Sequence, residues 1–117
     1  MLSISTQTRI YIAVDATDMR KGFDGLCGVV SSTLQQDPLS GALFLFLNKR
    51  RDRMKVLYWD GDGLAIWYRR LEQGTFQVPL RQGEASSFEI RSDEFMMLLR
   101  GIDLSSVRRR KRFQLAS

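Results

Sequence analysis

Two runs of large apolar residues flank a short Asp- and Gly-rich segment in the middle of the chain. The first run ends at Trp59, the second begins at Leu64, and Asp60-Gly61-Asp62-Gly63 lies between them. Gly and Asp tolerate the positive φ angles of a two-residue turn, so the pattern predicts a β-hairpin. Large groups on both faces favour a central place for it in a covered sheet. The predicted register pairs Trp59 with Leu64, Tyr58 with Ala65, Leu57 with Ile66 and Val56 with Trp67.

Other stretches predict the remaining strands of the sheet. Ala42–Asn48 is an almost continuous apolar run, which is typical of a buried strand, and it leads into Met54–Asp60 as a second hairpin. Pro79 cannot donate a ladder hydrogen bond, so the strand that it ends should be short or lie at an edge. The predicted strands are Arg9–Val14, Ala42–Asn48, Met54–Asp60, Leu64–Leu71, Thr75–Pro79 and Phe88–Arg91.

Apolar residues at three- and four-residue spacing predict two helices. The first covers about Met19–Gln35, with Phe23, Leu26, Cys27, Val30 and Leu34 on one face and Thr17 or Asp18 as the cap. The second covers about Ser92–Ile102, with Ser92 as the cap and Gly101 near its end.

These elements predict a single α+β domain over residues 9–104. An antiparallel, meander-like sheet of about five strands packs against one longer helix, and a short helix follows near the C-terminus. Residues 1–8 form a polar arm, and residues 105–117 form a basic, flexible tail.

Composition narrows the class of protein. The chain has 117 residues, and its longest apolar run, Ala42–Leu47, is far below the ~20 residues of a membrane span. Met1–Thr8 lacks the apolar core of a secretory signal, so we expect a cytoplasmic protein without a membrane partner. One cysteine and no histidine argue against an internal disulfide, a zinc site and Cys/His or Ser/His catalysis.

The net charge of +5 has a specific location. Five cations lie in the tail, and removing them leaves 13 basic and 13 acidic residues elsewhere. Within this neutral body, Lys49–Lys55 carries five basic residues and one acid, Asp52. Cations at a hairpin tip and in a terminal tail suit phosphate contacts, which orient DNA without reading its sequence. The candidate nucleic-acid-binding residues are Lys49, Arg50, Arg51, Arg53, Lys55, Arg20, Lys21, Arg69, Arg70, Arg108, Arg109, Arg110, Lys111 and Arg112.

Each of these features also has a structural interpretation. The basic segment could be a solvated loop that keeps sheet edges soluble, and the tail could attract an acidic protein surface. The aromatic residues of the hairpin are expected mainly in the core, with one or two rings exposed. The register places Lys55 opposite Tyr68, which would give a mixed aromatic and cationic face beside Arg69 and Arg70.

Several aspartates suggest a magnesium site, as in nucleases. We reject this as the leading interpretation, because hairpin-turn chemistry explains Asp60 and Asp62, and helix capping explains Asp15 and Asp18. No catalytic, cofactor-binding or metal-binding residue is predicted, and the protein is not expected to be an enzyme. A metal-dependent nuclease would need at least three carboxylates that converge in one cleft.

Three motifs resemble a known family. They are T-D-M-R-K-G-F-D-G-L at Thr17–Leu26, D-P-L-S-G at Asp37–Gly41, and D-R-M-K-V-L-Y-W-D-G-D-G-L-A-I-W-Y-R-R-L-E-Q-G-T-F at Asp52–Phe76. The chain resembles the TnpB-type accessory protein of the IS66 insertion-sequence family, from about Arg9 to about Leu104. That family is distinct from the RNA-guided nucleases of the same name. The resemblance implies a small protein that is encoded beside a DDE-type transposase and promotes movement of a bacterial mobile genetic element.

Together these features predict a non-enzymatic accessory protein for DNA transposition. It would bind DNA through the basic hairpin tip and assist the transposase, without a cofactor or a small-molecule substrate. The alternative is a protein-interaction module that docks the transposase, or another accessory subunit of the same element, without contacting DNA.

Overall fold

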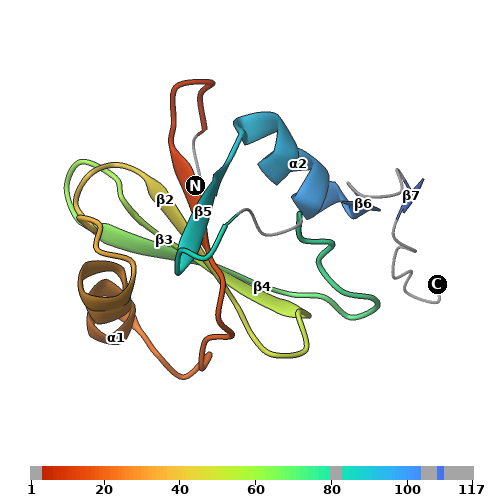
Figure 1. The fold of residues 1–117 in the computed structure, drawn as a ribbon, viewed down its shortest axis with the longest axis horizontal. Helices are drawn as coiled ribbons and strands as arrows, with labels where there is room; N and C mark the ends of the chain where they lie inside the picture. The colour runs from red at the N-terminus through yellow and green to blue at the C-terminus, as the bar shows by residue number, and fades with distance from the viewer. Residues whose placement is uncertain (1–3, 80–82, 104–107, 110–117) are drawn as a thin grey trace.

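Five strands form one sheet in the computed structural model, which describes residues 4–79, 83–103 and 108–109 (Figure 1). The order across the sheet is β4-β3-β2-β1-β5. A separate pair of two-residue strands, β6 and β7, follows the second helix. The strands are β1 (Ile10–Ala13), β2 (Leu43–Leu47), β3 (Arg53–Trp59), β4 (Leu64–Arg70), β5 (Ser87–Ile90), β6 (Ile102–Asp103) and β7 (Arg108–Arg109).

The sheet is mixed, so the prediction of a purely antiparallel meander is wrong at one pair. β1 and β2 run parallel, whereas the β2–β3, β3–β4 and β1–β5 pairs are antiparallel. The helical segment between β1 and β2 supplies the crossover that parallel neighbours need. β2 is therefore the central strand, and all five of its residues are buried.

The side chains of β2 alternate between two hydrophobic clusters. Leu43, Leu45 and Leu47 face one cluster, while Phe44 and Phe46 face the other. A strand that is covered on both sides can be apolar at every position, which explains the continuous L-F-L-F-L run.

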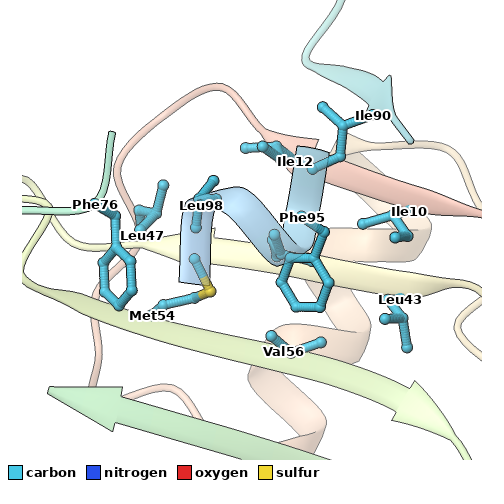
Figure 2. Packing of buried hydrophobic residues seen from close by; sticks show 11 residues of the cluster. Ile10, Ile12, Leu43, Leu47, Met54, Val56, Phe76, Ile90, Phe95 and Leu98 are labelled. Carbon is cyan, nitrogen blue, oxygen red and sulfur yellow. The ribbon is translucent and has the colours of Figure 1, made fainter. Parts of the chain in front are cut away.

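The first cluster lies under α2 (Ser92–Arg100). Figure 2 shows Phe95 and Leu98 of α2 among the side chains of the sheet, including Met54 and Val56 of β3. Phe76 joins the same cluster and is 1% exposed. α2 ends at Arg100, and the Gly101 that follows has a φ of +78°, which suits the left-handed conformation, so the predicted stop is confirmed. The predicted cap is wrong by one residue, because Arg91 is the N-cap and Ser92 is the first helical residue.

The second cluster lies under the first helix, which is shorter than predicted. α1 covers Phe23–Gly28 and continues as one π-helical segment, η1 (Val29–Thr33). The predicted inner face is confirmed at Leu26, Val30 and Leu34, which are all buried.

The predicted start and cap of this helix are wrong. Gly22 occupies the N-cap without a side-chain cap bond. The Asp18 carboxylate instead accepts hydrogen bonds from the Arg20 backbone amide and guanidinium. Residues 19–22 therefore form a connecting segment ahead of the helix.

The central hairpin has the predicted register at all four predicted pairs. Gly61 has a φ of +103°, and the Asp60 carboxylate accepts hydrogen bonds from the amides of Asp62 and Gly63. Its predicted central place is wrong, because β4 is an edge strand of the sheet.

The predicted strand Thr75–Pro79 is absent from the structure. The Phe76 amide donates to the Arg51 carbonyl instead. Within the part of the chain that the structure describes, no helix could span a membrane.

A candidate nucleic-acid interface

The basic segment forms an ordered loop between β2 and β3, which we call the tip loop (residues 48–52). The Asn48 amide oxygen accepts hydrogen bonds from the amides of Asp52 and Arg53, at 3.1 and 3.0 Å. Its amide nitrogen donates to the Asp52 carboxylate at 2.6 Å. This hydrogen bond is the main reason that the pKa of Asp52 lies below its usual value. The one acid of the basic segment thus holds the loop together.

Backbone hydrogen bonds join the tip loop to the segment that follows β4. The Asp52 carbonyl accepts from the Leu71 amide at 2.8 Å, and the Arg51 carbonyl accepts from the Phe76 amide at 2.8 Å. Arg51 itself has a φ of +58°, a left-handed conformation that is uncommon for a residue with a side chain. The backbone that carries the cations is therefore fixed by the residues around it.

Three cations of the tip loop are presented to solvent. Lys49, Arg50 and Arg51 are exposed, while Arg53 at the start of β3 is half-buried. No carboxylate of the described residues forms an ion pair with any of them. Their charges are available to an external anion.

Lys55 differs from these residues, because its side chain points into the fold. It is 9% exposed, and its ammonium donates to the carbonyls of Met19 and Lys21, each at 2.8 Å. The same nitrogen lies 4.9 Å from the centre of the Tyr68 ring. Lys55 thus stands apart from the exposed cations, and it fixes the segment before α1 against β3 and β4.

The structure brings Arg20 and Lys21 to the tip-loop end of the sheet. The Thr17 amide donates to the carbonyl of Leu47, the last residue before the tip loop, and Lys55 holds the chain at residues 19 and 21. Arg20 is paired with Asp18 at 2.7 Å, and its hydrogen bonds lower the pKa of that carboxyl to about 2. Lys21 is exposed and forms no ion pair with a described residue.

The end of β4 contributes two more cations, on opposite faces of the sheet. Arg70 is paired in register with Arg53 and forms an ion pair with Glu72 at 2.8 Å. Arg69 points to the other side, where it donates to the Leu99 carbonyl at 3.3 Å. Arg70 therefore lies on the α1 side with Tyr68, and Arg69 lies on the α2 side.

A small cleft beside the tip loop was not predicted. It has a volume of about 170 Å³ and lies where the parallel strands β1 and β2 end. Lys49, Arg51 and Asp15 line it together with apolar side chains such as Ile12 and Phe88. The parallel pairing creates this cleft, and the antiparallel sheet expected from the sequence would not have indicated it.

The structure describes two residues of the predicted basic tail. Arg108 and Arg109 form β7, which pairs with β6 after the end of α2. The remaining predicted tail residues, Arg110, Lys111 and Arg112, lie outside the described residues.

The aromatic residues of the hairpin divide as expected. Tyr58 and Trp67 pack against the α2-side cluster, and Trp59 is half-buried. Tyr68 is the exposed ring, with 48% of its surface accessible. Among the described residues, no group of three or more His, Cys, Asp or Glu side chains is placed to hold a metal ion.

Comparison with known proteins gives one family. A family model described as IS66 Orf2 like protein matches residues 8–109. Two similar proteins come from Sinorhizobium fredii (strain NBRC 101917 / NGR234). "Uncharacterized protein y4jC" is 36% identical over 94% of this chain and 92% of its own length. "Uncharacterized protein y4hO" is 37% identical over 88% of each. No solved structure gives a significant match.

Proposed function

The chain belongs to the IS66 Orf2-like family, and we propose that it is a non-enzymatic, DNA-binding accessory factor for transposition. In this proposal the tip loop lies along the phosphates of the element's ends in the cytoplasm. The bound protein then helps a DDE-type transposase to assemble there. The family associates the chain with the transposition process, and the structure supplies the surface on which the DNA-binding part of the proposal rests.

The observation that carries the proposal is the ordered presentation of unpaired cations. Lys49, Arg50 and Arg51 project from a backbone that is held in place by Asn48 and by two backbone hydrogen bonds from the segment after β4. A rigid loop loses less conformational entropy on binding than a flexible one. Contacts of this kind bind phosphates without sequence readout, as expected for a factor that assists a sequence-reading enzyme.

A protein-docking function is the second candidate, and the edge strand β4 favours it. One side of β4 has no partner strand within the described residues, and an extended segment of the transposase could pair there. Among the described residues, the exposed large apolar side chains lie on both sides of the sheet, with Phe23 and Tyr68 on the α1 side and Met96 on α2, so they do not form a single apolar docking patch. They are Phe23 on α1, Leu39 in the loop before β2, Tyr68 on β4 and Met96 on α2.

The proposal is tested by fluorescence anisotropy on a labelled duplex from an element end, at low and moderate salt. Arg50→Ala/Arg51→Ala should weaken binding at both salt concentrations. The matched control is Arg9→Ala/Arg91→Ala, which removes the same charge from two exposed ion pairs far along the fold from the tip loop. An equal loss of DNA affinity in both variants would show that binding depends only on the net charge of the protein. The proposal is also overturned if the wild type shows no salt-sensitive binding.

A further inference from the structure

Tyr68 is an exposed aromatic ring with a cation on one face. Its side chain is 48% exposed, and the Lys55 ammonium lies 4.9 Å from the ring centre. Lys55 is itself buried and held by two carbonyl oxygens. The ring is therefore supported from beneath by a fixed cation while much of its surface remains open to solvent.

A second exposed ring follows the segment that Lys55 holds. Phe23 is 48% exposed and is the first residue of α1, two positions after Lys21. The sequence pattern places Phe23 on the inner face of a helix, yet its ring is turned to water. The Lys55 ammonium joins the Lys21 carbonyl and the Tyr68 ring, so the segment that leads into Phe23 meets Tyr68 on the α1 side of the sheet.

Cations surround these rings on the same side. Arg70 lies two residues after Tyr68 on β4, and Arg53 is its partner in register on β3. Side chains two residues apart on a strand share a face, so Arg53 and Arg70 lie on the side of Lys55 and Tyr68. Lys21 is exposed and lies two residues before Phe23. From here the surface continues into the tip loop through Arg53.

We infer that this region binds single-stranded DNA, with unpaired bases stacked on Tyr68 and Phe23 and the phosphates along Lys21, Arg53 and Arg70. The inference rests on the proposed function and specifies the form of DNA that this surface takes. In a duplex the base faces are already stacked on one another, so an exposed ring offers them nothing. An unpaired base gains about 1–3 kcal/mol from stacking on an aromatic side chain.

The cationic surroundings favour this occupant over a protein segment. A protein-docking surface is expected to have apolar neighbours around its aromatic anchors. The cations near the rings in sequence and register are Lys21, Arg53, Lys55 and Arg70, against two carboxylates, Asp24 beside Phe23 and Glu72, which is paired with Arg70. Alternating rings and cations suit a chain of bases and phosphates.

The test compares a labelled oligo-dT of about 16 nucleotides with a duplex of the same length, by anisotropy at one salt concentration. Tyr68→Ala and Tyr68→Leu should each weaken binding of the single strand by about 5-fold or more, because each removes a stacking contact of about 1–3 kcal/mol. Tyr68→Phe should bind like the wild type, and so should the control Leu39→Ala, which alters a residue of similar exposure in the loop before β2. Duplex binding should not change in any of these variants.

The outcomes separate this inference from the proposed function. Unchanged single-strand binding in both Tyr68→Ala and Tyr68→Leu overturns the inference, whereas the Arg50→Ala/Arg51→Ala comparison on duplex still decides the proposed function. Equal losses on single strand and duplex also overturn it, because a stacking contact should spare the duplex. Loss of transposase capture by Tyr68→Ala, with DNA binding unchanged, assigns the region to a protein partner and overturns it as well.

Discussion

The Lys55 ammonium and the Tyr68 ring meet across the β3–β4 pair, 4.9 Å apart, and Lys55 is 9% exposed. The two carbonyl oxygens that complete its surroundings come from Met19 and Lys21, far earlier in the chain. One buried lysine thus joins the hairpin, the segment before α1 and the exposed aromatic ring.

Lys55→Met should therefore destabilise the fold. The variant keeps an unbranched apolar stem but leaves two carbonyls without their charged donor, which should cost about 2–3 kcal/mol. Urea unfolding measures the loss, and faster hydrogen exchange at the Thr17 amide should report loosening of the segment before α1. Lys49→Met is the control: this exposed lysine should change stability by less than about 0.5 kcal/mol. Equal stability of both variants would contradict the structural role of Lys55.

Arg51→Gly should separate DNA binding from stability. Arg51 has a φ of +58°, which glycine adopts without strain, so the variant should be as stable as the wild type or more stable by up to about 1 kcal/mol. It also removes one exposed cation of the tip loop and should weaken duplex binding. Thermal unfolding and anisotropy on the same sample make the comparison. Clear destabilisation would show that the Arg51 side chain supports the loop.

The carboxyl of Asp18 should titrate at about 2, because the Arg20 side chain and amide donate hydrogen bonds to it. Its pKa is lower in the folded chain than its ordinary value of 3.8. The pair therefore contributes stability above pH 3.8, and this contribution is lost as the pH falls towards 2. A ¹³C NMR titration of the side-chain carboxyls measures the midpoint. In Arg20→Gln it should move towards 3.8, and a wild-type midpoint already at that value would contradict the pairing.

Phe95→Ala should remove the main contact between α2 and the sheet. The ring is fully buried and lies among the side chains of the cluster under α2 (Figure 2), so its loss should cost about 3–5 kcal/mol. Met96→Ala, one residue away but 40% exposed, should cost less than about 0.5 kcal/mol. If the two variants have the same urea midpoint, the packing of the Phe95 ring does not stabilise the contact between α2 and the sheet.

Features that depend on local chemistry could be predicted from the sequence. The Asp-Gly turn determines the β3–β4 register, because Asp60 caps the amides of Asp62 and Gly63. The periodicity of Leu26, Val30 and Leu34 identifies the inner face of the first helix, and Gly101 identifies the end of the second. The cationic loop was also located, since its charges are consecutive in the chain.

Features that depend on distant partners could not be predicted. β1 and β2 pair in parallel, and the residues of the two strands do not indicate this direction. Thr75–Pro79 has strand-like residues, but the Phe76 amide bonds to the tip loop. The sequence predicts Lys55 to be a solvent-facing cation of the basic segment. The backbone carbonyls that accept its hydrogen bonds lie 36 and 34 residues earlier in the chain, so the sequence does not indicate them. The candidate site was thus identified by its residues, while its three-dimensional assembly required the structure.

The salt dependence of duplex binding tests the central claim most directly. The logarithm of the association constant should fall linearly with the logarithm of the salt concentration between about 50 and 200 mM, with a slope of about −0.9 per phosphate contacted. Removing Arg50 and Arg51 should make that slope shallower by about 2. The Arg9→Ala/Arg91→Ala control should keep the wild-type slope. A slope that is the same in all three proteins would contradict the claim that the tip loop contacts DNA.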